Sequence, residues 1–325
     1  MGLFKSKNAK TTVLKLGPTI KKKRMEIFYF DFGEPFLFAK LYKKNMLIKQ
    51  NVISIEKGQI EQGKIINVDP IIEQLKQISK NKFSIDLILS TNKAFDSIIS
   101  LPKISSSKIE QLKRKEMKNN FERYKDSYHL LEDEYNYNLG IIFIEHFISN
   151  NVINNWLEIT KGANAKLSSI TLLGNYLYNA INNKNEVDIP HFEDESLEEI
   201  NIKNKRKKKN SKKKSDKLTN FALIYVHGSM ATFVLSSMNQ FSTSYSFEFN
   251  SIEEIIKRFL LVIGKHEVEF EKTKIKDILV DSNKPLDLEK YFKDQKVRYI
   301  HFKMFDKQEN IIPIVNKTKE KRSKK

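Results

Sequence analysis

The predicted elements occur in the same order in two separate stretches of this 325-residue chain. Residues 27–90 read as three strands, a helix and a strand, and residues 221–281 repeat that order. Alternating apolar residues and short connections are typical of a strand meander. A helix before the fourth strand indicates a parallel, right-handed return to the same sheet. The sequence therefore predicts a duplicated α/β fold with two βββαβ halves.

Capping residues mark the ends of several predicted helices. Asp69 precedes Pro70 and an apolar helical face, which indicates an N-cap followed by proline at the first helical position. Ser251, with Glu254 three residues later, forms a capping-box pattern at the start of the helix in the second half. Gly162 follows another helical pattern and predicts a C-cap.

A further α/β stretch lies between the two halves. Residues 101–183 read as a helix, two strands, a helix, a strand and a helix, which we interpret as an inserted subdomain. The second half is short by comparison. A single helix connects its predicted strand at 245–249 to the strand at 276–281, and a short helix over 285–294 and a strand over 297–304 follow.

Charge is unevenly distributed along the chain. The formal net charge is +18, and the excess of basic residues is concentrated in the two tails and one insert. Three interpretations remain open: nucleic-acid binding through the run KRKKKNSKKKSDK, attraction to an anionic membrane, and the composition of an AT-rich genome. The predicted organisation is a flexible basic arm (1–24), a first subdomain (25–100), an inserted subdomain (101–183), a charged linker (184–218), a shortened second half (219–305) and a basic tail (306–325).

Composition also indicates the cellular compartment in which the protein is expected. The chain has no cysteine, which excludes disulfides and thiolate metal sites and is typical of a reducing cytoplasm. The opening MGLFKSKNAK lacks a signal-peptide core, and no run approaches the ~20 apolar residues that span a bilayer. We therefore expect a cytoplasmic protein.

Neither a metal motif nor a nucleophile motif is recognised in the sequence. The six histidines are scattered, without the spacing of metal ligands. The segment LEDEY places Glu132 and Glu134 on one face of a predicted strand and Asp133 on the other. We interpret these carboxylates as a solvated strand edge, and we expect no metal site and no catalytic residue.

Two turn sequences carry a family resemblance. YFDFGEPFLFAKL resembles the D-x-G phosphate loop of the actin-like pilus-assembly proteins of the PilM family, with the division protein FtsA as a more distant relative. The resemblance implies nucleotide contacts for Asp31, Gly33 and Lys40. FALIYVHGSMATFVL stands where the family's second phosphate loop belongs, which adds Gly228 and Thr232.

The resemblance covers roughly residues 27–182 and 219–303 and rests on order and spacing more than on identity. It implies an actin-like (ribonuclease-H-like) duplicated fold, with an FtsA/PilM-type inserted subdomain in the first half and a shortened second half.

All three places that contact nucleotide in the family are altered here. In the first loop, Glu34 puts a negative charge beside phosphate oxygens and Pro35 removes a backbone N–H. In the second loop, Val226 stands where the family has a carboxylate, and Ser282 and Asn283 replace paired glycines. We therefore expect no ATP hydrolysis and no cofactor, with ATP and Mg²⁺ binding weakened. Asp31 is either a turn aspartate that bonds its own backbone or a residual nucleotide contact.

Three functions follow from these observations. The resemblance implies a non-catalytic scaffold, peripheral to the membrane, on the cytoplasmic side of a pilus-like, motility or secretion machine. This scaffold docks a short cytoplasmic segment of a membrane protein against residues 101–182. Self-association and contact of the basic tails with anionic lipids accompany this hypothesis. The first alternative is an actin-like ATPase that polymerises or switches with nucleotide. The second is a nucleic-acid binder that uses residues 205–217.

Overall fold

The fold was analysed in a computed structural model of the chain. The structure describes residues 14–15, 23–32, 35–56, 58–61, 63–119, 125–137, 140–182, 187–188, 218, 220–237, 240–270 and 274–303. Two compact units divide the chain: unit 1 contains Met1–Tyr176, Ser246–Glu248 and Phe305–Lys325, and unit 2 contains Leu177–Tyr245 and Phe249–Met304. The charged run at 205–217 and the tail at 306–325 lie outside the described residues.

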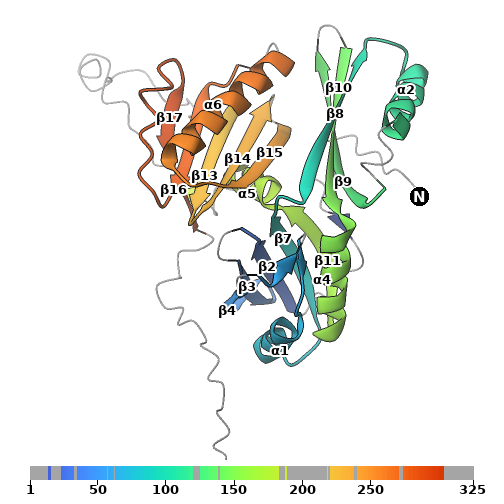
Figure 1. Ribbon diagram of the computed structural model, residues 1–325, viewed down its shortest axis with the longest axis vertical. Helices are drawn as coiled ribbons and strands as arrows, with labels where there is room; N and C mark the ends of the chain where they lie inside the picture. Colours follow the sequence, from blue (N-terminus) through green and yellow to red (C-terminus); the bar gives the residue numbers. More distant parts are fainter. Residues whose placement is uncertain are drawn as a thin grey trace, which may run out of the picture. The chain divides into compact units, whose positions relative to one another are not determined.

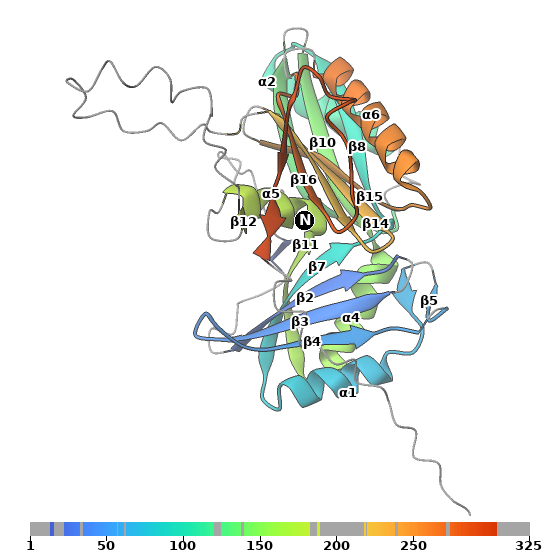
Figure 2. The same cartoon turned by 90° about the vertical axis from the view of Figure 1, so that its left-hand side faces the viewer.

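A six-stranded sheet forms the centre of unit 1, with the strand order β1-β11-β7-β2-β3-β4. Figure 2 shows β2, β3 and β4 as a meander along one side of it. The strand β7 runs parallel to both β2 and β11, and β2, β3 and β4 pair antiparallel in sequence. The strands are β1 (Leu14–Lys15), β2 (Lys23–Phe30), β3 (Phe36–Lys43), β4 (Met46–Ser54), β7 (Phe83–Ser90) and β11 (Ala165–Leu172). The N-terminal arm therefore contributes a short strand, because β1 pairs with β11.

The helices α1 (Asp69–Ile78) and α4 (Asn150–Gly162) lie beside this sheet. Trp156 of α4 is fully buried and meets Tyr29 edge to face, with the ring centroids 5.6 Å apart. Asn155 of α4 satisfies both backbone groups of Ile65: its amide donates to the carbonyl (3.1 Å) and its oxygen accepts from the N–H (3.0 Å). This buried side chain ties the two-stranded ribbon β5 (Ile60–Glu61) and β6 (Lys64–Ile65) to α4.

Two predicted helix ends are displaced. Asp69 is the first residue of α1 and Val68 is its N-cap, so the predicted capping role of Asp69 is wrong by one position. The predicted C-cap at Gly162 is also wrong: Gly162 ends α4, Ala163 is the C-cap, and Asn164 carries the left-handed φ of 54°. Asparagine tolerates this conformation because its side chain bonds locally, so it replaces the expected glycine.

The inserted subdomain is a three-stranded antiparallel sheet with the order β8-β10-β9 and the helix α2 (Ser106–Asn119) packed against it. Its strands are β8 (Ala94–Pro102), β9 (Ser127–Tyr137) and β10 (Gly140–Ser149). The sequence pattern did not reveal β8, because polar Asp96, Ser97 and Ser100 interrupt its alternation. The structure also assigns β11, within the predicted insert at 101–183, to the six-stranded sheet.

Unit 2 repeats the strand order of unit 1. Its five-stranded sheet has the order β15-β14-β13-β16-β17, which matches β4-β3-β2-β7-β11 position by position. Pairing is antiparallel between β13 and β14 and parallel from β13 to β16 and from β16 to β17. Figure 1 shows α6 lying across this sheet. The strands are β13 (Phe221–His227), β14 (Met230–Ser237), β15 (Gln240–Glu248), β16 (Asp277–Ser282) and β17 (Lys296–Tyr299).

The helix α6 (Ile252–Glu269) begins at the predicted cap. The Ser251 hydroxyl accepts from the Glu254 N–H at 3.2 Å, and the Glu254 carboxylate accepts from the Asn250 N–H at 3.0 Å. The predicted helix at 285–294 is not formed, and turns occupy this segment. A short strand pair, β12 (Val187–Asp188) with β18 (His301–Phe302), completes unit 2. Among the described residues, no helix is long and apolar enough to cross a membrane.

Candidate functional site

The turn between β2 and β3 holds Asp31 at the end of the sheet. Because β2 and β7 are parallel, Asp31 and Thr91 emerge side by side from their ends. The Thr91 hydroxyl donates to Asp31 Oδ2 at 2.5 Å, and the Asp31 N–H donates to the Ser90 carbonyl at 3.3 Å. The buried Asp31 Oδ1 has no hydrogen-bond partner in the described part of the chain. Gly33 and Glu34 lie outside the described residues.

Burial has the largest effect on the pKa of the Asp31 carboxyl. It raises the pKa of Asp31 to about 6, against the hydrogen bond from Thr91, the charge of Lys93 and a hydrogen bond from the Asp31 backbone. A carboxylate that is desolvated and only half satisfied retains the capacity to accept one more donor. Asp31 is thus held by a tertiary partner as well as by its own backbone.

Lys40 lies away from this turn. In the β2–β3 register, Phe36 is opposite Phe30 beside the turn, whereas Lys40 is opposite Glu26. Four residues of strand separate Lys40 from Phe36, which is about 13 Å along β3. The buried ammonium of Lys40 lies 5.4 Å from the ring centroids of both Phe28 and Phe38. The structure therefore does not bring Lys40 to Asp31.

The corresponding turn of unit 2 contains the other two predicted residues. Gly228 has a φ of 61°, which favours glycine, and a Cβ added there would meet nothing within 4 Å. Thr232 is fully buried in β14, and its hydroxyl lies 3.9 Å from the sulfur of Met230. Asp31 and Lys40 belong to unit 1, and Gly228 and Thr232 to unit 2.

Two of the altered places do meet within unit 2. Val226 pairs in register with Ser282, and the Asn283 N–H donates to the Val226 carbonyl at 3.3 Å. Val226 is buried, and the Ser282 hydroxyl is engaged with both backbone groups of Lys284. The nearest carboxylate along β16, Asp281, accepts from the Phe302 N–H at 2.8 Å and so supports β18.

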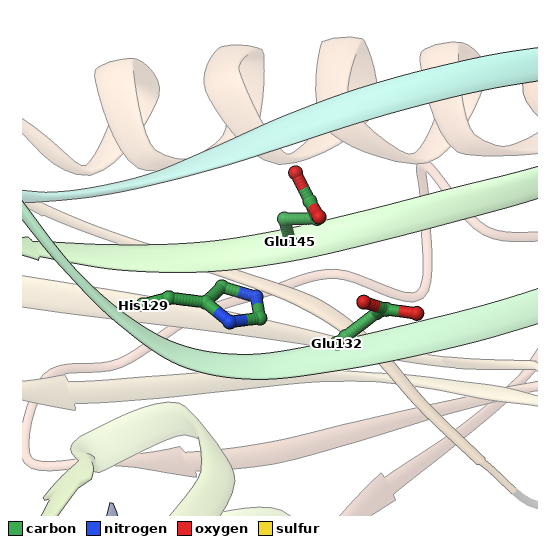
Figure 3. Close-up of side chains that lie close together, drawn as sticks. All are labelled: His129, Glu132 and Glu145. Carbon is green, nitrogen blue, oxygen red and sulfur yellow. The ribbon is translucent and has the colours of Figure 1, made fainter. Parts of the chain in front are cut away.

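A second cluster of ionisable groups lies in the inserted subdomain, and sequence spacing did not reveal it. We define the α2 cluster as His129, Glu132, Glu145 and Lys113. Figure 3 shows His129 and Glu132 on β9 beside Glu145 on β10. The ligand atoms of these three residues lie within 4.8 Å of one another. A His–Glu–Glu set of this size can hold a divalent cation.

A β-bulge creates the α2 cluster. The register shifts between His146 and Phe147, so that β9 gains one residue relative to β10. Glu132 therefore faces Glu145 while His129 faces Phe147, and residues three apart on β9 share one face. A regular strand would place them on opposite faces, and that assumption explains why the sequence did not predict the cluster.

Lys113 already supplies a positive charge to the α2 cluster. Its ammonium makes an ion pair with Glu132 and lies 3.5 Å from Glu145 Oε1 and 4.7 Å from the Phe143 ring centroid. Burial raises the pKa of Glu145, with Lys113 opposing that shift, and burial lowers the pKa of His129. Glu145 Oε2 and His129 Nε2 have no hydrogen-bond partner among the described residues. The interpretation of Glu132 as part of a solvated strand edge is therefore wrong.

The opposite face of the same sheet holds a buried triad of one residue from each strand. His146 of β10 lies 2.7 Å from the Asp96 carboxylate of β8 and 3.4 Å from the Asp133 carboxylate of β9. Burial alone lowers the pKa of His146, but the charge of Asp96 and the hydrogen bonds to both carboxylates outweigh it and raise the pKa to about 10. His146 is thus a fixed imidazolium that joins the three strands. Asp133 is also buried, which again contradicts the predicted solvated edge, whereas Glu134 is exposed as predicted.

We expect His146 to make stability fall between pH 6.5 and 10. Its folded pKa exceeds the usual 6.5, so the stabilisation is complete below pH 6.5 and is lost as the pH rises through about 10. Within this window the free energy of unfolding decreases by up to ~1.4 kcal/mol per pH unit. Urea denaturation across this pH range measures the decrease, and His146→Gln should flatten it.

The matched control for this prediction is His301→Gln, which removes an exposed histidine. Burial lowers the pKa of three other histidines, which are His129, His227 and His266. These histidines therefore affect stability only below pH 6.5. An unchanged pH slope in His146→Gln would contradict the assignment.

We expect Lys113→Ala to turn the α2 cluster into a zinc site. The substitution removes the resident positive charge and leaves one imidazole and two carboxylates within reach of one ion. Zn²⁺ at a hundred times its dissociation constant should stabilise the variant by ~2.7 kcal/mol, roughly 5–10 °C in melting temperature. The wild-type protein should show a much smaller shift. Lys113→Ala combined with His129→Ala is the control, and an equal zinc shift in that protein would refute the site.

Comparisons with known proteins identify the fold. No protein-family model matches the sequence, and no curated protein matches it. Among solved structures, a chain of the PilM–PilN type IV pilus biogenesis complex matches with a TM-score of 0.52 and 10% identity, over 86% of this chain and 91% of that chain. The cytoplasmic domain of EpsL, an inner-membrane component of the type II secretion system of Vibrio cholerae, gives a TM-score of 0.47 and 9% identity over 86% and 89%.

A Bacteroides thetaiotaomicron protein of unknown function with an actin-like ATPase fold gives a TM-score of 0.42 and 11% identity, over 86% and 90% of the two chains. The predicted α/β actin-like fold is confirmed, and the chain resembles the pilus-assembly PilM proteins in structure.

Proposed function

We propose that this protein is a non-catalytic actin-like scaffold on the cytoplasmic side of a membrane-associated machine of the pilus or secretion type. The observation that carries the proposal is the fold shared with a chain of the PilM–PilN complex over 86% of this chain. That complex acts in type IV pilus biogenesis. The shared region includes both units and is not limited to one sheet, which supports a similar role for the whole chain.

The side chains at the family's nucleotide positions support a non-catalytic role. The Lys40 ammonium lies against two aromatic rings, Val226 is buried where a carboxylate is needed, and Ser282 is engaged in its own turn. These residues do not fit a Mg-ATP site, because none of them offers a charge or a carboxylate to the phosphates or the metal. Asp31 alone retains suitable chemistry, since its Oδ1 lacks a partner in the described part of the chain.

The partner in this proposal is a short cytoplasmic segment of a membrane protein, docked on the inserted subdomain. In the sheet β8-β10-β9, β8 and β9 are edge strands. An edge strand offers unpaired backbone groups that an extended peptide can use, while its side chains select the sequence. Tyr128 and Asn136, near the two ends of β9, are exposed. We therefore assign the docking surface to β9.

We expect a photo-crosslinking residue at Tyr128 or Asn136 to capture an integral membrane protein in cells of the host. The control position is Leu261 of α6, which is 65% exposed but lies in unit 2. Mass spectrometry of the crosslinked product identifies the partner and the segment. A synthetic peptide of that segment should then bind the purified chain, and it should bind less tightly when Asn136 is replaced by proline, which removes an N–H from the strand. Equal capture at all three positions would argue against docking on β9.

We expect Mg-ATP to leave the melting temperature unchanged. A nucleotide at a hundred times its dissociation constant would stabilise the protein by ~2.7 kcal/mol, or roughly 5–10 °C. A thermal-shift titration with Mg-ATP, ADP and a metal-free control measures this. A shift that Asp31→Ala abolishes would instead favour an actin-like nucleotide switch that retains Asp31 as its ligand.

A further inference from the structure

The hairpin between β3 and β4 ends in a cluster of basic and apolar side chains. We call residues 43–49 (KKNMLIK) the hairpin tip, and every residue in it is exposed. Met46 is 66% exposed, Leu47 40% and Ile48 50%. Three consecutive exposed apolar residues are unusual on a protein surface and mark an interaction site. The proposed function does not use them.

The backbone explains why the tip projects. Lys44 and Asn45 have φ values of 50° and 65°, and Lys43 pairs with Met46 across them, so a tight two-residue turn closes the hairpin. Successive side chains of a strand point to opposite faces. Met46 and Leu47 therefore lie on opposite faces, and since both are exposed, neither face of β4 is covered at this end. Ile48, which is also exposed, falls where the β3–β4 register shifts. The strand is also the edge of its sheet.

The charge at the tip is strongly positive. Lys43, Lys44 and Lys49 flank the apolar residues, and no acidic residue occurs between Pro35 and Ile55. Lys23 lies directly opposite Lys43 in the β2–β3 pairing, which adds a further positive charge. No ion pair involves these four lysines within the part of the chain that the structure describes. Such a surface is complementary to an anionic partner.

We propose that the hairpin tip inserts its apolar side chains into the interface of an anionic lipid bilayer. Apolar residues exposed on both faces of a projecting strand suit a medium that surrounds them, whereas a protein groove covers mainly one face. The lysines at the hairpin tip are complementary in charge to acidic headgroups, which attract basic residues close to the surface. A second copy of the chain would bring like-charged lysines together and is disfavoured. This inference extends the proposed scaffold role at the membrane, but it does not depend on the identity of the protein partner.

The test uses the absence of cysteine in the chain. Leu47→Cys in the full chain gives a single site for an environment-sensitive fluorophore, and Leu261→Cys on α6 gives a matched exposed apolar site. We expect vesicles of phosphatidylcholine mixed with anionic phosphatidylglycerol to blue-shift the emission at position 47 only. Pure phosphatidylcholine vesicles should cause a much smaller shift.

Vesicle co-sedimentation distinguishes binding by insertion of the hairpin tip from electrostatic attraction of the basic tails to the vesicles. The triple variant Met46→Ser, Leu47→Ser, Ile48→Ser should bind anionic vesicles at least about tenfold more weakly, since each apolar side chain contributes to burial. Leu261→Ser with Val268→Ser on α6 is the control and should bind like the wild type.

Unchanged vesicle binding by the triple variant, with no fluorescence shift at position 47, would overturn the proposal. A shift at position 47 that requires only nucleic acid, or only higher protein concentration, would also overturn it and identify a different occupant. Vesicle binding that the triple variant loses, without capture of a membrane protein in cells, would leave this inference standing while the proposed scaffold function fails.

Discussion

The parallel pairing of β2 with β7 is the constraint on which the rest of unit 1 depends. A meander of β2, β3 and β4 leaves one side of β2 free, and only a strand that returns through a connection can pair there in parallel. That pairing places the ends of the two strands together, and so brings Thr91 to Asp31 across 60 residues of sequence. Unit 2 uses the same arrangement with β13 and β16, where Asn283 bonds to Val226.

The inserted subdomain depends on a different kind of interaction. An apolar cluster of Ile99, Leu101, Ile141 and Phe143 packs with Ile109 and Leu112 of α2. Charged groups also join its elements: Lys113 connects α2 to two strands, and His146 connects all three strands on the other face. Buried ion pairs are costly unless each member is paired, so a shift in strand register that separated these groups would be unfavourable. The bulge in β9 brings His129 to the face of Glu132, whereas the His146 triad lies in the regular part of the register.

The actin-like fold suggests nucleotide binding, whereas the residues at the loop positions argue against it. The actin-like framework is retained over most of the chain, whereas the positions that would contact phosphate and metal carry a buried valine, a lysine packed on phenylalanine rings and a serine committed to its own turn. In the proposed scaffold, a framework of this kind serves to present surfaces. The edge strand β9 and the basic tip of the β3–β4 hairpin are the two surfaces on unit 1 that we propose for this role.

The sequence by itself determined the duplication, because strand and helix periodicities and capping residues such as Ser251 are local signals. Which phosphate-loop positions are altered is implied by the resemblance to the PilM family and stays a prediction, although the proline and the valine themselves can be read directly. The sequence did not reveal β8, because polar residues interrupt its alternation and its pairing with β10 is a long-range contact. It also predicted a helix at 285–294, where turns form.

Only the tertiary structure decided the sites. Which carboxylates are buried depends on strand register, and a single extra residue in β9 brought His129 and Glu132 to the same face. The distance of Lys40 from the Asp31 turn, by contrast, follows from its place along β3, a strand that the sequence predicted. Register and bulges arise from contacts between distant segments, so local sequence patterns do not encode them in a readable form.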